Sequence, residues 1–246
     1  ALLAPMPKGN KMPKRGKKYR AACEEVDSRM LYPPREAVKL AKQTAVTKFD
    51  ATVELHIRVG VDPRDAEQQV RSSVVLPHGL GKDIRVLVFA EGDAARDAEK
   101  AGADFIADED VVKKIQDGWT DFDVVLAVPE MMGNVGRLGR ILGPRGLMPN
   151  PKSGTVVAGE DLPRLIGETK SGRISFRLDK SANLHVPIGK ASFSEQALNE
   201  NFTALVDAVM RARPASAKGS FLRRVTLAAT MGPGIRVDPN AIVSLD

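Results

Sequence analysis

The chain has 246 residues, enough for one large domain or two ordinary ones, and a hydrophobic fraction of 43%, which is typical of a globular protein with a buried core. It contains no run of about eighteen apolar residues, so we predict no membrane span and no membrane partner. The only cysteine, Cys23, excludes an internal disulfide framework and is typical of a reducing cytosol.

The formal net charge of +6 is unevenly distributed along the chain. Residues 1–20 contain seven basic and no acidic residues, residues 79–171 contain 12 basic and 16 acidic residues, and residues 172–246 contain ten basic and six acidic residues. We therefore predict a disordered basic tail over residues 1–20 that contacts nucleic acid, and a second anion-binding region in the last third. A tail that serves only solubility is the alternative interpretation.

The first third of the chain predicts a helix followed by two strands. Residues 35–46 carry apolar side chains at helical spacing, and two prolines precede them. In residues 49–61 the apolar positions follow a period of two, which predicts a strand with one buried and one polar face. Residues 74–76 form a further short strand in this interpretation.

The middle of the chain has a different pattern. Residues 84–90 (IRVLVFA) are almost continuously apolar, as in a strand covered on both faces. Strands and helices then alternate, which predicts a parallel α/β domain. The later predicted elements are a helix over 93–101, a strand over 104–107, a helix over 109–116, a strand over 123–128 and helices over 131–142 and 162–169.

The last third returns to strands with alternating polarity. A strand is predicted from residue 173 to 178, and we expect residues 184–188 to pair with it through a turn at 179–183. Residues 194–211 form the strongest predicted helix, with Ser194 as its N-cap. A last strand follows over residues 224–230.

These patterns predict an α/β (α+β) fold with two domains. Both chain ends, residues 21–78 and 172–246, build an α+β domain with an antiparallel sheet. Residues 79–171 form an inserted Rossmann-like parallel α/β domain. Because both crossings between the domains are rich in glycine, we expect Gly79, Gly81 and Gly172 to act as hinges.

No residue set points to catalysis, a cofactor or a metal. The glycines of residues 133–154 lack the spacing of a P-loop and follow the third strand of the middle block, so close helix packing and a rigid loop are favoured over nucleotide binding. His56 and His185 have no nucleophile motif beside them, and Cys23 has no ligand-spaced partner. A nucleotide-dependent enzyme stays as an alternative that binding of labelled nucleotide would test.

One long string resembles a known family. Residues 139–152 (GRILGPRGLMPNPK), followed by Gly154 and Thr155, resemble the signature of the bacterial ribosomal protein L-one family. Other similar strings occur in the expected order, and the resemblance runs from about Tyr19 to Asp238, whereas the segment before it is longer than expected. These strings are residues 48–50, 75–79, 122–125, 179–180, 188–190, 217–219 and 230–234.

The resemblance implies a structural constituent of the large subunit of cytoplasmic ribosomes, present there as a monomer. Such proteins bind ribosomal RNA (rRNA) at the mobile stalk beside the tRNA exit site and help deacylated tRNA to leave. Bacterial members also repress translation of their own operon by binding its mRNA. A free RNA-binding regulator with no place in the ribosome is the competing interpretation, and co-sedimentation with large subunits would distinguish the two.

The resemblance also implies which residues contact RNA. A polar strand face can present hydroxyl groups to RNA, and glycine allows close backbone approach. We expect Thr230 to face outward, so that Thr230→Ala lowers RNA affinity and leaves the melting temperature unchanged. The positions that match the family are Lys48, Phe49, Thr52, Glu54, Asp179, Lys180, Thr226, Thr230, Met231 and Gly232; Arg173, Arg177, Arg223 and Arg224 are added as phosphate contacts on charge alone.

Each of these positions has an alternative interpretation. Phe49 could be a core aromatic residue, Met231 a side chain that fills a gap in the core, and Glu54 an ordinary solvated strand residue. The four arginines could each be ordinary surface residues.

Overall fold

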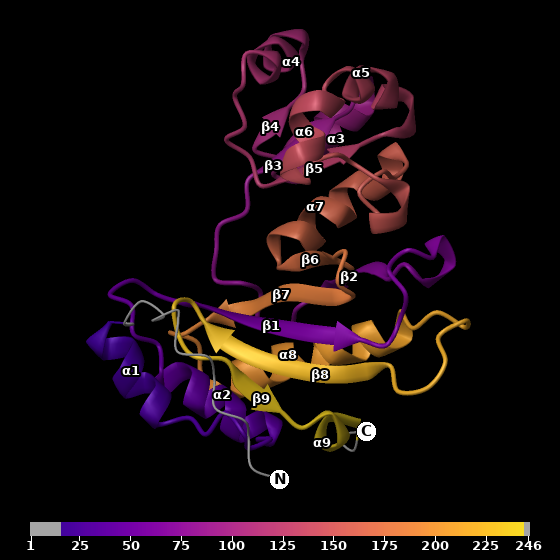
Figure 1. Ribbon diagram of the computed structural model, residues 1–246. Coiled ribbons are helices and arrows are strands. Elements are labelled where there is room, and N and C mark those ends of the chain that lie inside the picture. Colours follow the sequence, from indigo (N-terminus) through magenta and orange to yellow (C-terminus); the bar gives the residue numbers. More distant parts are fainter. Residues whose placement is uncertain (1–15, 244–246) are drawn as a thin grey trace, which may run out of the picture.

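The computed structural model describes residues 16–243 and contains two main sheet systems, with a two-stranded ribbon between them (Figure 1). The larger sheet is antiparallel, with the strand order β7-β1-β8-β9. The alternation of apolar and polar residues explains its single buried face, which helices α2 and α8 cover. Its strands are β1 (Thr52–Val59), β7 (Asn183–Lys190), β8 (Leu222–Ala229) and β9 (Ile235–Val237), and the helices of this part are α1 (Lys17–Glu24), α2 (Pro34–Gln43), α8 (Glu195–Arg211) and α9 (Pro239–Val243).

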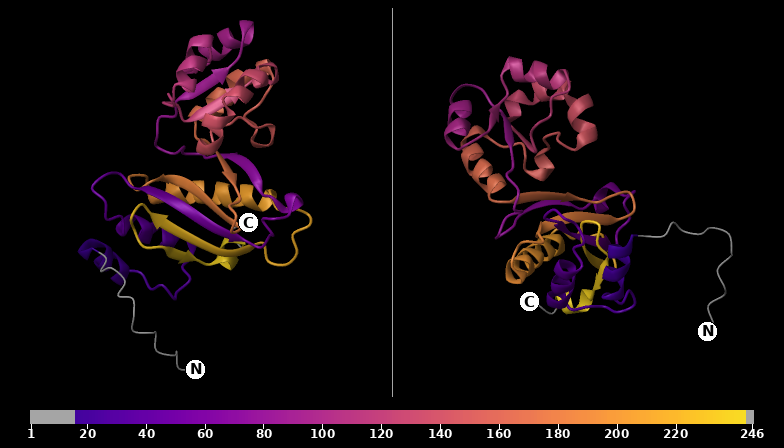
Figure 2. Two further views of the ribbon diagram at one scale, coloured as in Figure 1. Left: turned by 45° about the horizontal axis from the view of Figure 1, so that its top comes forward. Right: turned by 90° about the vertical axis from the view of Figure 1, so that its left-hand side faces the viewer.

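The middle of the chain, β3 through α7, forms the second system, which we call the insert. Its parallel sheet has the order β4-β3-β5, and its buried side chains form a core separate from that of the antiparallel sheet. Two chain segments connect the insert to the rest (Figure 2). Its elements are β3 (Val86–Phe89), α3 (Gly92–Lys100), β4 (Phe105–Ile106), α4 (Glu109–Gln116), β5 (Val124–Ala127), α5 (Met132–Arg137), α6 (Gly139–Arg145) and α7 (Leu162–Lys170), with 3-10 turns η2 (Pro129–Met131), η3 (Pro151–Ser153) and η4 (Gly159–Asp161).

A two-stranded ribbon lies where the insert meets the antiparallel sheet. It consists of β2 (Arg71–Val75), which follows the 3-10 turn η1 (Ala66–Gln68), and β6 (Arg173–Arg177). An antiparallel sheet from both chain ends and an inserted parallel sheet together confirm the predicted fold class.

The predicted pairing of residues 184–188 with the strand over 173–178 is wrong. Strand β7 pairs with β1, from Thr52 opposite Lys190 to Arg58 opposite Asn183, and β6 pairs with β2 instead. The turn explains the difference, because the Asp179 carboxylate accepts the N–H groups of Ser181 and Asn183 and directs the chain away from β6. The apolar face of β7 then joins the same core as that of β1.

Two further predictions need correction. The single helix over 131–142 is two helices, α5 and α6, which meet at the fully buried Leu138. The glycines within this stretch weaken a continuous helix, so the chain turns there while both helices keep apolar side chains in the core. The disordered tail was predicted to reach residue 20, but α1 begins at Lys17 and buries Ala22; residues 1–15 lie outside the described part of the chain.

Candidate nucleic-acid interface

The face of the antiparallel sheet that the helices leave uncovered is polar. Alternation along β1 and β8 brings Thr52, Glu54, His56, Thr226 and Thr230 to this side, which we call the polar face. In Figure 1 this sheet lies in front of α8. Most of the predicted RNA contacts from β1 and β8 therefore lie together.

A network of hydrogen bonds joins the start of β1 to the end of β8 at Thr52 and Thr230. The N–H of Thr52 donates to Oγ1 of Thr230 (3.1 Å), and that hydroxyl donates to the carbonyl of Thr52 (3.1 Å). Lys190 Nζ also donates to Oγ1 of Thr52 (3.0 Å). The Thr230 hydroxyl thus holds the sheet together, and the expectation that it only faces outward is wrong.

Two large apolar side chains stand exposed near this junction. Phe49 is 62% exposed and precedes Thr52 by three residues, while Met231 is 73% exposed and directly follows Thr230. Neither belongs to a core, so the core alternatives for both residues are wrong. Met231 also has a φ of 62°, a conformation uncommon for a residue other than glycine, and one that makes it project from the turn.

Gly232 closes the same turn. Its N–H donates to the carbonyl of Ala229 (2.8 Å), and a Cβ atom there would lie 3.1 Å from the carbonyl oxygens of both Ala229 and Thr44. A larger side chain would therefore disturb the fold as well as any ligand. Lys48 is exposed in the segment before β1.

A chain of four polar side chains crosses β1 and β7. The Nδ1 atoms of His56 and His185 lie 2.9 Å apart, Nε2 of His185 lies 3.4 Å from Oδ2 of Asp179, and Nε2 of His56 lies 4.0 Å from Oε2 of the half-exposed Glu54. Sequence reasoning missed both histidines as site residues. The period-two pattern had placed His56 beside Glu54, but the contact with His185 joins residues 129 positions apart.

Burial and hydrogen bonding shift the pKa values of two of these four side chains, His56 and Asp179. Burial, and then the neighbouring His185, lower the pKa of His56, while Glu54 opposes the shift. Desolvation raises the pKa of Asp179, but bonds from Asn183 and Ser181 outweigh it, so the pKa lies below its ordinary value. The turn that carries the exposed Lys180 is therefore held by a charged carboxylate.

The predicted arginines do not all reach the polar face. Arg224 and Arg223 are exposed on β8, and Arg224 lies directly opposite Arg58, which sequence reasoning had not singled out. Arg177 is exposed on the ribbon. Arg173 instead forms an ion pair with Glu168 (2.9 Å) and donates to Oγ of Ser73, so it belongs to the junction with the insert.

The predicted hinge glycines lie where the two chain segments join the insert. Gly79, Gly81 and Gly172 all have positive φ, at 64°, 65° and 111°. This conformation favours glycine and fixes the path of the chain at the junction.

Between residues 16 and 243 there is no group of three or more histidine, cysteine or acidic side chains that could hold a metal ion. In the same range, no helix is both long and apolar enough to cross a membrane.

Comparison with known proteins agrees with the resemblance. A model of the Ribosomal protein L1p/L10e family matches residues 41–233. Large ribosomal subunit protein uL1 of Thermobifida fusca (strain YX) is 58% identical over 228 residues, which cover 93% of this chain and 96% of that protein. The protein of the same name from Chloroflexus aurantiacus (strain ATCC 29366 / DSM 635 / J-10-fl) is 57% identical over 235 residues, 95% of this chain and 99% of that protein. Because both matches span almost the whole chain, it belongs to the Ribosomal protein L1p/L10e family.

Proposed function

We propose that the chain is a structural constituent of the large ribosomal subunit and that it binds rRNA directly through the polar face. Residues 21–78 and 172–246 form the RNA-binding domain in this proposal, and residues 79–171 form the inserted domain. Membership of a ribosomal protein family, whose relatives are named large-subunit proteins, supports the place in the subunit. By the same membership the chain is not an enzyme.

The arrangement of the polar face carries the proposal for RNA. Arg58 and Arg224 are cross-strand partners, and like charges placed opposite each other are unfavourable unless an anion lies nearby. Exposed Phe49 and Met231 beside the Thr52–Thr230 junction offer apolar surfaces on which unpaired bases can stack. The arginine pair at one end of the β1–β8 pair and the exposed apolar side chains at the other end offer phosphate contacts and base stacking on one sheet, which supports RNA as the ligand.

The finer roles follow from the family resemblance. The RNA is the mobile stalk beside the tRNA exit site, where the chain assists the release of deacylated tRNA. It also represses translation of its own operon by binding an mRNA site with the same recognition features. One RNA-binding surface is enough for rRNA and mRNA, because both present the same contacts to the polar face.

The test compares exposed apolar side chains beside the Thr52–Thr230 junction with one away from it. Phe49→Ala and Met231→Ala should each weaken binding of a stalk rRNA fragment, since loss of one stacking contact costs about 1–3 kcal/mol. Met30, 55% exposed in the segment before α2, provides the matched control Met30→Ala, which should bind as the parent does. All three should keep the parent melting temperature. Equal affinities for the four proteins would place the RNA elsewhere.

The competing interpretation, an RNA-binding regulator with no place in the ribosome, requires a different measurement. A chain that works only on mRNA should separate from large subunits during sedimentation at moderate salt, whereas a subunit constituent should remain bound. If the parent stays bound to large subunits and Phe49→Ala is released, the surface around Phe49 is what holds the chain in the subunit.

A further inference from the structure

The ribbon of β2 and β6 turns a basic face toward the insert. Its register places Arg71 opposite Arg177 and Val75 opposite Arg173. Because alternate residues of a strand share a face, all three arginines lie on one side of the ribbon. Ile174 and Phe176, on the other side, are buried in the core of the antiparallel sheet.

Arg71 and Arg177 lack a neutralising partner. Arg173 has Glu168, but neither of the other two arginines forms an ion pair within residues 16–243. The carboxylate of Asp123 lies in the same region and is already engaged by Lys82 and Arg85. Two like charges at directly opposite positions of an antiparallel pair destabilise it, so this arrangement calls for an anion.

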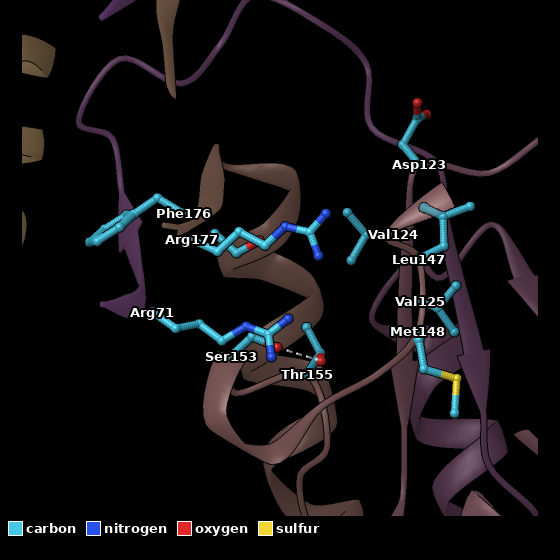
Figure 3. Close-up of a pocket in the computed structure, with 12 residues that line it drawn as sticks. Arg71, Asp123, Val124, Val125, Leu147, Met148, Ser153, Thr155, Phe176 and Arg177 are labelled. Carbon is cyan, nitrogen blue, oxygen red and sulfur yellow. Dashed lines mark hydrogen bonds between the residues drawn. The ribbon is translucent and has the colours of Figure 1, made fainter. Parts of the chain in front are cut away.

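The two side chains point into a cleft of about 200 Å³ between the ribbon and the insert. Figure 3 shows both guanidinium groups directed from the ribbon toward the insert. A Cβ atom at Gly146 would lie 3.9 Å from Nη2 of Arg177, so the glycine leaves room for the guanidinium. The far wall includes Ser153 and Thr155, whose hydroxyl oxygens lie 3.1 Å apart, and the Asp123 carboxylate, which Lys82 and Arg85 already neutralise.

We propose that Arg71 and Arg177 bind a phosphate group in this cleft. A guanidinium group presents a planar fork of N–H donors that matches phosphate oxygens, and two forks side by side provide two such contacts. The bound phosphate removes the repulsion between the arginines. Because the walls belong to the ribbon and to the insert, the phosphate also holds these two parts together.

This cleft lies apart from the polar face. The Gly–Pro loop between Gly146 and Thr155 contributes to its wall. The chemistry fits either free phosphate or a phosphodiester of RNA. The two sources differ in what the loss of the arginines does to RNA affinity.

The first experiment measures the melting temperature of the full chain in phosphate and in chloride at equal ionic strength. Phosphate should raise the melting temperature of the parent and of Arg211→Gln, a control on the exposed end of α8. The response should disappear in the Arg71→Gln/Arg177→Gln double variant, and phosphate affinity measured by titration should fall by about tenfold or more. A response that survives in the double variant would overturn the site.

A second variant tests the repulsion directly. Ser175 is exposed on the ribbon, on the same face as Arg177, and lines the cleft. Ser175→Asp should supply a permanent negative charge, raise the melting temperature in chloride and abolish the phosphate response. If Ser175→Asp still responds to phosphate as the parent does, the arginines are not the binding groups.

The RNA arm identifies the source of the phosphate. If the cleft takes an RNA phosphodiester, the double variant should bind the stalk fragment more weakly and lower the slope of log affinity against log salt by about one. If it takes free phosphate, RNA affinity stays at the parent value and only the phosphate response is lost. If the double variant keeps both the RNA affinity and the phosphate response of the parent, the proposal is rejected. The RNA affinity of Phe49→Ala tests the surface beside the Thr52–Thr230 junction independently of the cleft.

Discussion

A Cβ atom at Gly172 would lie only 2.4 Å from the Cα of Gly79, so the two chain segments that join the insert to the antiparallel sheet touch through bare backbone. The N–H of Leu76 also donates to the carbonyl of Gly172 (3.2 Å). The junction is therefore a single packed contact rather than two independent tethers. Any change in the position of the insert has to slide or break this contact.

Gly172→Ala should disturb this contact in a way that backbone strain alone does not. An alanine at positive φ costs on the order of 1–2 kcal/mol anywhere in the chain. Gly118 has a similar φ of 102°, and no atom lies within 4 Å of the position that a Cβ atom would occupy there, so Gly118→Ala is the matched control for strain. At Gly172 the methyl group also meets backbone, which should add about 1–3 kcal/mol.

Urea unfolding gives the difference in stability, and small-angle scattering gives the position of the insert. Gly172→Ala should change the scattering curve and Gly118→Ala should not. Equal stability losses and unchanged scattering for both variants would mean that the contact between the two segments does not restrain the insert.

Asn201 on α8 forms hydrogen bonds to the backbone of the same junction. This fully buried side chain accepts the N–H of His78 (3.0 Å) and donates to the carbonyls of Gly79 (3.0 Å) and Ile188 (2.8 Å). Asn201→Ala should leave these backbone groups without partners and cost about 2–4 kcal/mol, measured by urea unfolding. Asn199 is a partly exposed neighbour on α8 whose side chain bonds only its own helix, so Asn199→Ala should cost less than about 1 kcal/mol. Similar losses for the two variants would contradict this role.

The elements with strong periodicity could be predicted from the sequence. Residues 109–116 are helical as expected, and Ser194 caps α8 by accepting the N–H of Ala197 (3.1 Å). Both depend on neighbours within a few positions, which a local pattern contains. Helix α1 was missed because basic side chains hide its one buried residue, Ala22, and β9 is only three residues long.

Strand pairings and side-chain contacts between residues far apart in the sequence were harder to predict. The pairing of β7 with β1 depends on which apolar faces share a core, and the period-two pattern of a single strand does not contain that information. The same limit applies to the site. Thr230 could be placed on a strand end, but its bonds to Thr52, 178 positions away, appear only when the strands are aligned.

These bonds change what a substitution at Thr230 should do. Thr230→Val keeps the shape of the side chain and removes a hydroxyl that both accepts from and donates to Thr52, so it should lower stability by about 1–2 kcal/mol as well as RNA affinity. Thr226 lies on the same face of β8 and forms no side-chain hydrogen bond within the described residues. Thr226→Val should therefore lower RNA affinity at unchanged stability. A Thr230→Val protein that melts with the parent would restore the original expectation of a purely outward-facing hydroxyl.

The His56–His185 pair should make the stability of the chain depend on pH. Burial, and then the charge of His185, lower the pKa of His56 below its ordinary value of 6.5. The folded chain therefore holds this proton less tightly than the unfolded chain does. The resulting stability is fully present above pH 6.5 and is lost as the pH falls from 6.5 through the folded-state pKa. The carboxylates whose pKa values are lowered, Asp179 among them, act only at more acidic pH, because their ordinary values are 3.8 to 4.5.

Urea midpoints at pH 7.5 and pH 5.5 separate His56 from other groups. The parent should lose stability between these values, and His56→Gln should lose less, because glutamine keeps a polar side chain at this position without a titrating proton. His185→Gln should also lose less than the parent, since the positive neighbour that lowers the pKa of His56 is gone. Equal losses in all three proteins would show that the contact between the two Nδ1 atoms, although only 2.9 Å long, does not govern the response to acid.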